Sequence, residues 1–409
     1  MSEWKIYRLG DICKNVCSGG TPKSTEPLYY GGEIPWLNTK EVDFCRIAKT
    51  EKTITDSGFQ NSSTKWIDKN SVIVAMYGAT AAKVAVNTIP LTTNQACCNL
   101  MIDPNLADFR FVYFYLCYKY TSLAALANGG AQQNLNTQRI KDFEITLPLL
   151  KEQKCIADIL WALDDKIELN RRINANLEEQ AQALFKSWFV DFEPFRDSPF
   201  VDSELGKIPK GWKVNSIEDL ASYIASGGTP RSLDSSYYDG DIRWFTTKEL
   251  KDEFLFDSEK HISQTALKNS AAKLFPENTV LMAIYASPTV GRLGILTAES
   301  TCNQAAVGII AKEELGYAYL YLLLLSERIN LNNLASGAAQ QNLNVGIVKR
   351  YRVLVPTIDI LGTFNEIINP IFATIRNNTA QIYNLSALRD TLLPKLMSSE
   401  LSVESNYEL

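Results

Sequence analysis

The chain has 409 residues, of which 46% are hydrophobic and 21% are charged, which is typical of a globular protein with two or three domains. Its longest apolar stretches, such as 315–325, are too short to cross a bilayer, and charges fill the start where a signal peptide needs an apolar segment. A net charge of −5 argues against a protein that coats nucleic acid without regard to sequence. We therefore expect a cytoplasmic protein with no membrane partner.

Cysteine and histidine are used in ways that disfavour metal sites and catalytic triads. The eight cysteines fall at irregular positions without a CxxC pair, and His261 is the only histidine. A zinc site of cysteine and histidine is therefore not expected. We predict free thiols in a reducing compartment and no bound metal.

The chain contains an internal repeat, with two copies of one sequence unit. The segment SGGTPKSTEPLYYGGEIPWLNTKE begins at Ser18, and SGGTPRSLDSSYYDGDIRWFTTKE begins 208 residues later at Ser226. The spacing shifts by one residue in the middle and returns to 208 at GGAQQNLN (Gly129) and GAAQQNLN (Gly337). Such a regular spacing predicts a tandem duplication, with two copies of one fold.

In each copy, the hydrophobic pattern predicts a mixed α+β globule of about 150 residues followed by a long helix. We expect buried strands at 72–77 and 280–285, helices at 109–120 and 317–328, and closing strands at FEITLPL and YRVLVP. The stretch FRDSPFVDSELGKIPKGW between the copies is rich in proline, glycine and charge, which is typical of a linker.

Each long helix carries an apolar seam with heptad spacing. The first seam comprises Ile156, Leu160, Leu163, Ile167, Leu177, Ala181, Leu184 and Trp188, with Asn170 and Asn174 in its middle. The second comprises Phe364, Ile368, Ile371, Ile375, Asn378, Ile382, Leu385, Arg389, Leu392 and Leu396. Two such helices can cover each other's seam as an antiparallel pair, a rod about 55 Å long with a globule at each end. A polar contact between Asn170 and Asn378 would fix the register of the pair; the alternative is that each asparagine faces water.

Motifs of catalysis are missing. The sequence has neither a P-loop nor a GxGxxG segment. NPIF at Asn369 lacks the second proline of a DNA amino-methyltransferase loop, and Glu152 with Lys154 lacks the partner acid of a nuclease site. We therefore expect a non-catalytic chain, with an unrecognised methyltransferase or nuclease as the alternative.

Polar side chains suited to base edges recur at matched positions of the two copies. The candidate DNA-binding residues are Thr21, Lys23, Ser24, Lys40, Lys83, Gln132, Gln133 and Asn134 in the first copy, and Thr229, Arg231, Ser232, Lys248, Arg292, Gln340, Gln341 and Asn342 in the second. SGGTP is interpreted first as a structural loop, and a loop whose N–H groups bind phosphate is the alternative. For the Gln-Gln-Asn runs the alternative is helix capping.

The segments SGGTP…YY…W, NGGAQQNLN, LPLLKEQKCIADIL and SELGKIPKGW resemble, in content and order, the recurring segments of DNA specificity (S) subunits of type I restriction–modification systems. The resemblance covers the whole chain. It implies an α+β architecture of two target recognition domains separated by two long helices that form an antiparallel coiled coil. The expected boundaries are recognition domains at 1–150 and 212–358, helical regions at 151–193 and 359–400, a linker at 194–211 and an acidic tail at 401–409.

The resemblance also implies a place in a larger enzyme. Each recognition domain would read one half of an asymmetric, bipartite target in double-stranded DNA. A rod of roughly 50 Å would then hold the readers about fifteen base pairs apart on DNA that is not sharply bent. Two methyltransferase (M) subunits would bind the chain, and motor-endonuclease (R) subunits would join through them. S-adenosylmethionine, ATP and magnesium are then expected on the partner subunits, and no cofactor on this chain.

In the first helical region, the candidate residues for binding the M subunits are apolar, namely Trp161, Phe185, Trp188 and Phe189. For Trp188 and Phe189 the alternative is packing against the first globule or the linker. The second helical region departs from the family pattern, with Arg389 in its seam. Two other functions remain open: the specificity partner of a fused restriction–methylation enzyme, and a coiled-coil scaffold with no role at DNA.

Overall fold

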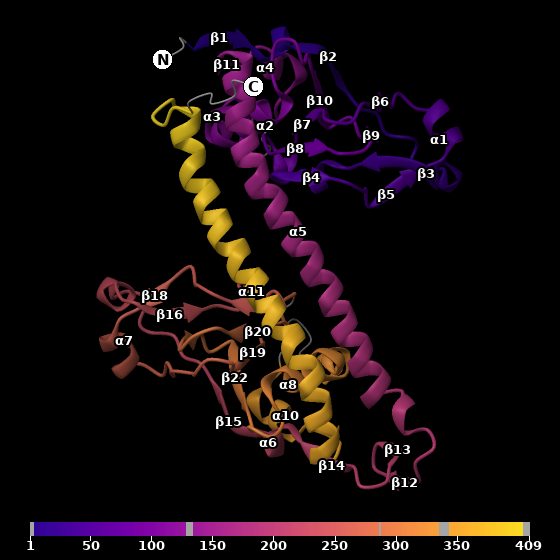
Figure 1. Cartoon of the computed structure of the whole chain (residues 1–409), viewed down its shortest axis with the longest axis vertical. Helices are drawn as coiled ribbons and strands as arrows, with labels where there is room; N and C mark the ends of the chain where they lie inside the picture. Colours follow the sequence, from indigo (N-terminus) through magenta and orange to yellow (C-terminus); the bar gives the residue numbers. More distant parts are fainter. Residues whose placement is uncertain (1–3, 128–133, 286–287, 335–342, 404–409) are drawn as a thin grey trace, which may run out of the picture. The chain divides into compact units, whose positions relative to one another are not determined.

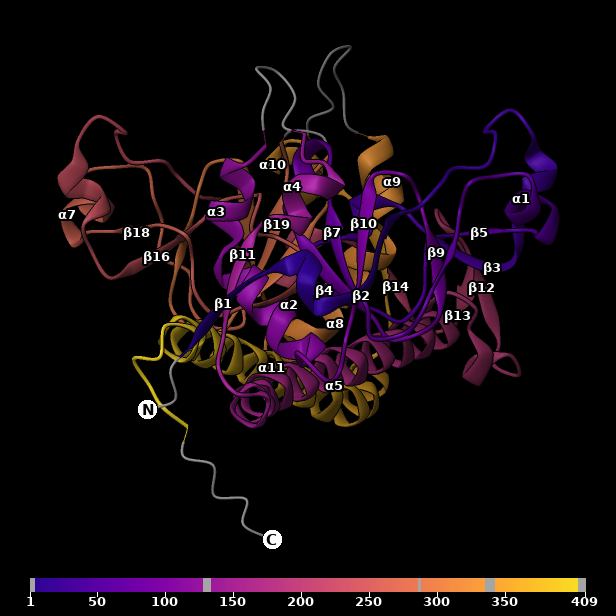
Figure 2. The same ribbon diagram turned by 90° about the horizontal axis from the view of Figure 1, so that it is seen from above.

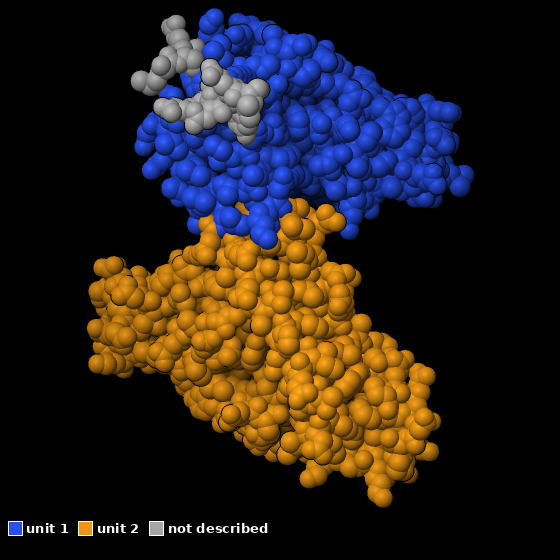
Figure 3. Space-filling view, in the orientation of Figure 1, with its two compact units in different colours: residues 1–166, 385–409 blue, residues 167–384 orange. Residues whose placement is uncertain are grey.

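The computed structural model describes residues 4–127, 134–285, 288–334 and 343–403. The chain divides into two compact units, Met1–Lys166 with Leu385–Leu409 and Ile167–Asn384, which Figure 3 shows in separate colours. Each unit contains one copy of the duplicated globule and one section of both long helices, α5 (Leu150–Phe189) and α11 (Ile358–Met397).

Unit 1 is built around a five-stranded sheet in the order β2-β10-β7-β8-β4 and a four-stranded sheet in the order β5-β3-β9-β6, while β1 pairs with β11. Its elements are β1 Lys5–Arg8, β2 Cys13–Ser18, β3 Tyr30–Leu37, β4 Cys45–Ile47, β5 Lys52–Ile54, α1 Asp56–Gln60, β6 Trp66–Ile67, β7 Val72–Ala75, β8 Val84–Asn87, β9 Leu91–Thr93, β10 Cys97–Ile102, α2 Phe109–Tyr118, α3 Tyr120–Ala125, α4 Thr137–Lys141 and β11 Glu144–Leu147 (Figure 1). β3, β5 and α1 lie to one side of β7 and β10, so the unit has two lobes (Figure 2).

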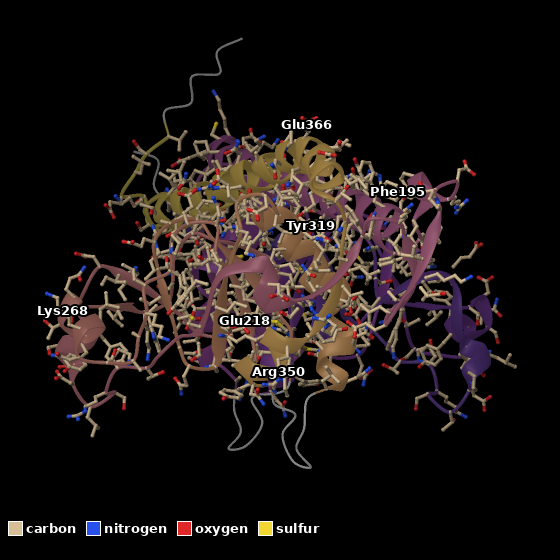
Figure 4. All side chains as sticks on the ribbon, turned by 90° about the horizontal axis from the view of Figure 1, so that it is seen from below. Phe195, Glu218, Lys268, Tyr319, Arg350 and Glu366 are labelled. Carbon is tan, nitrogen blue, oxygen red and sulfur yellow. The ribbon has the colours of Figure 1, made fainter. Side chains whose placement is uncertain are left out.

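Unit 2 repeats this plan, with sheets in the orders β15-β22-β19-β20-β17 and β18-β16-β21 and with β14 paired to β23. Its elements are β12 Phe200–Ser203, β13 Gly206–Pro209, β14 Lys213–Ser216, α6 Ile217–Leu220, β15 Ala221–Ser226, β16 Ile242–Phe245, β17 Glu253–Leu255, β18 His261–Ile262, α7 Gln264–Lys268, β19 Val280–Ala283, β20 Leu293–Leu296, β21 Thr301–Cys302, β22 Ala306–Ala311, α8 Tyr317–Ser326, α9 Arg328–Asn333, α10 Val345–Arg350 and β23 Arg352–Val355. Figure 4 shows Tyr319 in the interior of this unit and Lys268 at the outer end of its second lobe.

The central strands are continuous apolar runs because both faces of the sheet are covered. Val72 and Val74 of β7 face a core that includes Phe111 of α2, whereas Ile73 and Ala75 face a second core on the other side. β19 alternates in the same way between two cores of unit 2. The predicted strands, helices and closing strands are thus confirmed, except that the helix expected over 109–120 is divided into α2 and α3, and the one over 317–328 into α8 and α9.

The two long helices are antiparallel within each unit. In unit 2, Asn170 contacts Gln381 and Asn174 contacts Ile375, so residue numbers rise along α5 as they fall along α11. In unit 1, Asp164 of α5 accepts a hydrogen bond from Arg389 Nη1 of α11 at 2.8 Å. This bond accounts for the charged residue in the second seam, because it gives Arg389 a carboxylate partner on the facing helix.

An asparagine layer interrupts the apolar seam of unit 2. Asn174 Nδ2 donates to Thr379 Oγ1 at 3.0 Å and to Ile375 O at 3.3 Å, and Asn378 Nδ2 donates to Asn174 Oδ1 at 2.9 Å. A polar layer therefore exists, but the pairing expected between Asn170 and Asn378 is wrong: Asn378 donates to Asn174, and Asn170 donates to Gln381. Such a layer fixes the register of a helix pair, because any shift leaves buried amides without partners.

The segment predicted as a linker, 194–211, is a folded part of unit 2. Its strands β12 and β13 form an antiparallel hairpin, and Ile208 is buried in the main core of the unit. Phe195 packs edge-on against Trp188 of α5 and against Trp212. Proline, glycine and charge mark the turn of this hairpin and its exposed face, which explains why the composition resembled that of a linker. The eight cysteines are free thiols, as expected.

Candidate nucleic-acid interface

One edge of the five-stranded sheet gathers the loops that carry the repeated motifs. In unit 1, β2 ends at Ser18 and β7 at Ala75, and both run antiparallel to β10, which begins beside them at Cys97. β3 ends at Leu37, paired with Thr93. The loops after these strands leave on the same side, which we name the loop edge. It comprises 18–24, 38–43, 76–83, 94–96 and Asn134 in unit 1, and 226–232, 246–251, 284–285, 288–292 and 303–305 in unit 2.

The SGGTP segment is a packed structural loop in both units. A Cβ atom on Gly19 would lie 2.0 Å from the carbonyl oxygen of Thr93, and one on Gly227 would lie 2.1 Å from that of Cys302. The N–H group of Gly20 donates to Thr93 O at 2.9 Å. Glycine is required here by this close approach of two backbones. The interpretation as a structural loop is confirmed, and the N–H group of Gly20 is not free to bind phosphate.

The paired tyrosine and the tryptophan of each motif hold this loop. Trp36 Nε1 donates to Gly20 O at 3.0 Å, and Tyr30 Oη donates to Pro22 O at 2.8 Å. Burial raises the pKa of the Tyr30 phenol. The same bonds recur in unit 2, from Trp244 to Gly228 at 2.9 Å and from Tyr238 to Pro230 at 2.9 Å. The motif is therefore a set of contacts that shapes one loop.

The exposed side chains of this loop meet a glutamine that the candidate set did not include. Thr21 donates from its hydroxyl to Gln95 Oε1, and Thr229 donates to Gln304 Oε1, with all four residues exposed. The signal was present in the sequence, because NQ at 94–95 and 303–304 recurs beside the SGGTP repeat. Lys23, Ser24, Arg231 and Ser232 are exposed on the same loops.

The remaining basic candidates also lie at the loop edge. Lys83 Nζ pairs with Asp43 Oδ1 at 2.7 Å, and Lys40 pairs with Glu51, which raises the pKa of Lys40. In the described part of unit 2, Lys248 and Arg292 have no ion pair, and Lys251 stands where unit 1 has Asp43. The two edges thus share a framework but differ in charge.

The Gln-Gln-Asn runs are only partly described. Gln132, Gln133, Gln340, Gln341 and Asn342 lie outside the described residues. Asn134 is exposed and forms an isolated β-bridge with Tyr77, which places it at the loop edge. The last asparagine of each motif, Asn136 or Asn344, accepts a hydrogen bond from the backbone of the following helix as its N-cap.

The aromatic residues expected to dock M subunits are packed inside the chain. Phe185 and Phe189 are 3% and 6% exposed and contact Tyr319 and Phe364. Trp188 packs on Phe364 and on Phe195 of the folded hairpin. Trp161 lies against Phe109, Tyr113 and Phe114, with the guanidinium of Arg46 3.6 Å above its ring. These four residues therefore build the cores of the two units. For Trp188 and Phe189, the alternative was packing against the first globule or the linker. Trp188 does contact Phe195 of the segment predicted as linker, but both residues join the core of the second globule.

Among the described residues, no cluster of histidine, cysteine and acidic side chains could hold a metal ion, and no helix is long and apolar enough to span a bilayer. The candidate interface consists of hydrogen-bonding and basic side chains on loops. Such groups bind base edges and phosphates.

A family model described as type I restriction modification DNA specificity domain matches residues 1–179 and 209–385. The chain belongs to the S-subunit family of type I restriction–modification systems. It is 30% identical to the specificity subunit of the type I restriction enzyme MjaIX from Methanocaldococcus jannaschii, over 98% of this chain and 94% of that one. It is 24% identical to the HindI specificity subunit of Haemophilus influenzae, over 98% and 100%.

The fold agrees with this assignment. The crystal structure of the type I S subunit from M. genitalium aligns with 97% of this chain and 96% of its own, with a TM-score of 0.61 and 17% identity. S subunits are the non-catalytic specificity components of type I enzymes, and the duplicated α+β domains and antiparallel long helices predicted from the sequence are confirmed.

Proposed function

We propose that each unit reads one half of an asymmetric, bipartite target in double-stranded DNA through its loop edge. The observation that carries the proposal is a contrast between framework and surface. The bonds of the SGGTP loop recur one for one in the two units, whereas exposed neighbours differ, with Asp43 replaced by Lys251 and Thr25 by Leu233. One scaffold with two different surfaces is suited to two different half-sites.

Within each edge, we assign different roles to shared and divergent side chains. The Thr21–Gln95 pair has an equivalent in Thr229–Gln304. The two units would read different sequences but make this contact identically. Such a contact is suited to the DNA backbone, which is chemically the same at every base pair. Divergent residues such as Lys23 and Arg231 are then the candidates for base edges.

The M subunits need another docking surface, because Phe185 and Phe189 are buried and the half-buried Trp161 and Trp188 pack on rings of this chain. Exposed apolar side chains remain on the outer face of α5 in unit 2, where Leu169 is 49% and Ile173 37% exposed, one helical turn apart. We propose that this face binds an M subunit. Replacing both residues by lysine is expected to prevent assembly without unfolding the chain. Ile329→Lys, at a site that is 73% exposed on α9, is the control.

We also propose that the helix pair sets the spacer between the half-sites. Both helices have 40 residues, and a helix pair sets a single distance only if its two helices have matched lengths. One heptad adds about 10 Å, or about three base pairs. Matched heptads inserted in α5 and α11 should therefore lengthen the spacer by about three base pairs, whereas a single insertion should disrupt the pairing.

The decisive experiment is co-expression with the M subunit and mapping of methylated adenines across a genome by single-molecule sequencing. A bipartite motif with a fixed gap is expected. If an assembled, cofactor-binding complex methylated no such motif, the proposal would be wrong. A methylated motif that loses one half when Lys23 is replaced, and the other half when Arg231 is replaced, would assign the two readers.

A further inference from the structure

The two loop edges differ in net charge. In the segments that define it, the edge of unit 1 has three cationic and two acidic side chains, namely Lys23, Lys40, Lys83, Glu41 and Asp43. The edge of unit 2 has four cationic side chains and one acidic one, namely Arg231, Lys248, Lys251, Arg292 and Glu249. The ranges 128–133, 286–287 and 335–342, which the structure does not describe, contain no charged residue in the sequence. The net charge is therefore +1 at the first edge and +3 at the second.

One acid is common to both edges and binds the backbone. Glu41 and Glu249 each accept hydrogen bonds from two backbone N–H groups, at 2.7–2.9 Å. Asp43 is different, because its side chain is 59% exposed and lies 2.7 Å from the ammonium group of Lys83. The acid that distinguishes the two edges is thus Asp43, which unit 2 replaces by Lys251.

The acid next in sequence is engaged inside unit 2. Asp252 Oδ2 accepts a hydrogen bond from Arg328 Nη1 at 3.0 Å, and its Oδ1 accepts one from the N–H group of Leu293 at 2.8 Å. Phe44 and Tyr120 occupy the places of Asp252 and Arg328 in unit 1, as an edge-on pair of rings 5.2 Å apart. The exchange adds an acid and a cation that neutralise each other, so it does not reduce the charge of the second edge.

Three cations at the edge of unit 2 form no ion pair in the described part of the chain, namely Lys248, Lys251 and Arg292. Burial raises the pKa of the Glu253 carboxyl and the nearby charge of Lys251 opposes this rise, but no ion pair joins these two described residues. At the edge of unit 1, by contrast, two of the three cations are neutralised by ion pairs. The second edge thus holds cationic groups that are available to an anion.

We propose that unit 2 makes the larger share of the phosphate contacts to DNA, through Lys251 and Arg292, and that unit 1 contributes mainly discrimination between bases. A cation that binds a phosphate releases counterions, so each contact makes log K fall by about 0.9 for each unit of log salt concentration. Lys83 would have to leave Asp43 to do this, and the carboxylate would repel the phosphate. The inference rests on the proposed reading of DNA by the loop edges and goes further in naming the unit that holds the duplex.

The test compares equivalent positions of the two units in the assembled complex with M subunit. Binding to a duplex with the mapped motif is measured by fluorescence anisotropy between about 50 and 200 mM salt. Arg292→Met and Lys251→Met should each weaken binding and reduce the slope of log K against log salt by about 0.9. Lys83→Met should reduce it by less than half as much, because Asp43 already neutralises this lysine. Lys312→Met, exposed beyond the opposite end of β22, is the control and should leave the slope unchanged.

A variant with the opposite effect separates charge from a structural role. Asp43→Asn frees Lys83 and should strengthen binding, with a slope steeper by up to about 0.9. Arg292→Lys keeps a cation and should keep the slope of the wild type. The methylated motif should be the same in all of these variants, because phosphate contacts carry no sequence information.

The outcomes distinguish the inference from the proposed function. If the wild-type complex bound no bipartite motif, the proposed function would fail. If it did bind one, equal reductions of the slope in Lys83→Met and Arg292→Met, or no reduction in either, would overturn the assignment of the phosphate contacts to unit 2. If thermal unfolding showed that Arg292→Met does not fold, Lys251→Met and Asp43→Asn, both at exposed positions, would decide.

Discussion

Replacing Asn378 by leucine is expected to destabilise unit 2 more than replacing Asn174, although both belong to one hydrogen-bonded layer. Asn174 is 7% exposed, and its Oδ1 accepts a hydrogen bond from Asn378 Nδ2 at 2.9 Å. Asn378→Leu removes that donor and leaves a buried oxygen without a partner. An orphaned buried acceptor costs about 1–3 kcal/mol.

Asn174→Leu leaves no such group. Thr379 still donates to Ile375 O at 2.8 Å, and the amide of Asn378 is only half-buried, so water can replace its partner. Burial of the leucine offsets the lost hydrogen bonds by about 1.5–3 kcal/mol. We expect this variant to be close to the wild type in stability. The double variant should then be about 1–3 kcal/mol more stable than Asn378→Leu alone.

Hydrogen exchange of the backbone amides at 371–382 measures this, because it reports local opening of α11 in unit 2. The four proteins of the cycle should rank in protection as wild type and Asn174→Leu first, the double variant next, and Asn378→Leu last. Equal protection in the two single variants would refute the reasoning, because the difference in burial of the orphaned group would then have no consequence.

Three further predictions concern other parts of the fold. Gly19→Ala should destabilise unit 1 by about 1–3 kcal/mol or more in urea unfolding, because its Cβ would meet backbone, whereas Gly362→Ala in α11, which has open space, should stabilise by about 0.5–1 kcal/mol. Burial and nearby Glu253 and Asp252 raise the pKa of Glu178 to about 7 from its ordinary 4.5, so the folded chain keeps a proton that the unfolded chain loses. Stability should therefore fall as pH rises from 4.5 to 7, and Glu178→Gln should reduce this fall in a series of thermal unfolding curves. Asp164→Asn should lower the unfolding midpoint of unit 1 by the equivalent of about 1–3 kcal/mol and make it less salt-dependent, because Arg389 loses a carboxylate that is 12% exposed.

The duplicated architecture could be predicted from sequence because its signals are local or strictly spaced. The run at Val72–Ala75 is apolar at every position, which marks a strand covered on both faces, and the matched seams mark two helices that need a partner. The hairpin within 194–211 could not be predicted. Its two strands are short, and its packing depends on Ile208, which is buried in a core built largely from later parts of the chain.

The candidate site was predicted in part. Repetition identified Thr21 and the basic residues, and the sheet topology brings them to one edge. The repeat also includes Gln95, but a glutamine beside a short turn does not by itself indicate a binding residue. Its place in the candidate site becomes clear only from its contact with Thr21 in the structure. The packing of Phe185 and Phe189 inside unit 2 could not be predicted for a different reason. An aromatic residue on an amphipathic helix is apolar whichever protein covers it, so sequence gives no means of separating a chain's own globule from a partner.

The two copies differ where a contact can be made in more than one way, and agree where it cannot. Against the long helices, unit 1 uses Arg46 and Asp164 where unit 2 uses Phe254 and Phe372, because a volume between a helix and a sheet can be filled by an ion pair or by packed rings. At the SGGTP loop a Cβ atom would lie within about 2 Å of a carbonyl oxygen in either copy, and no change of neighbouring side chain relieves a contact between backbones. The loop that supports the candidate readers therefore has little freedom to change, which is what a fixed frame for variable contacts requires.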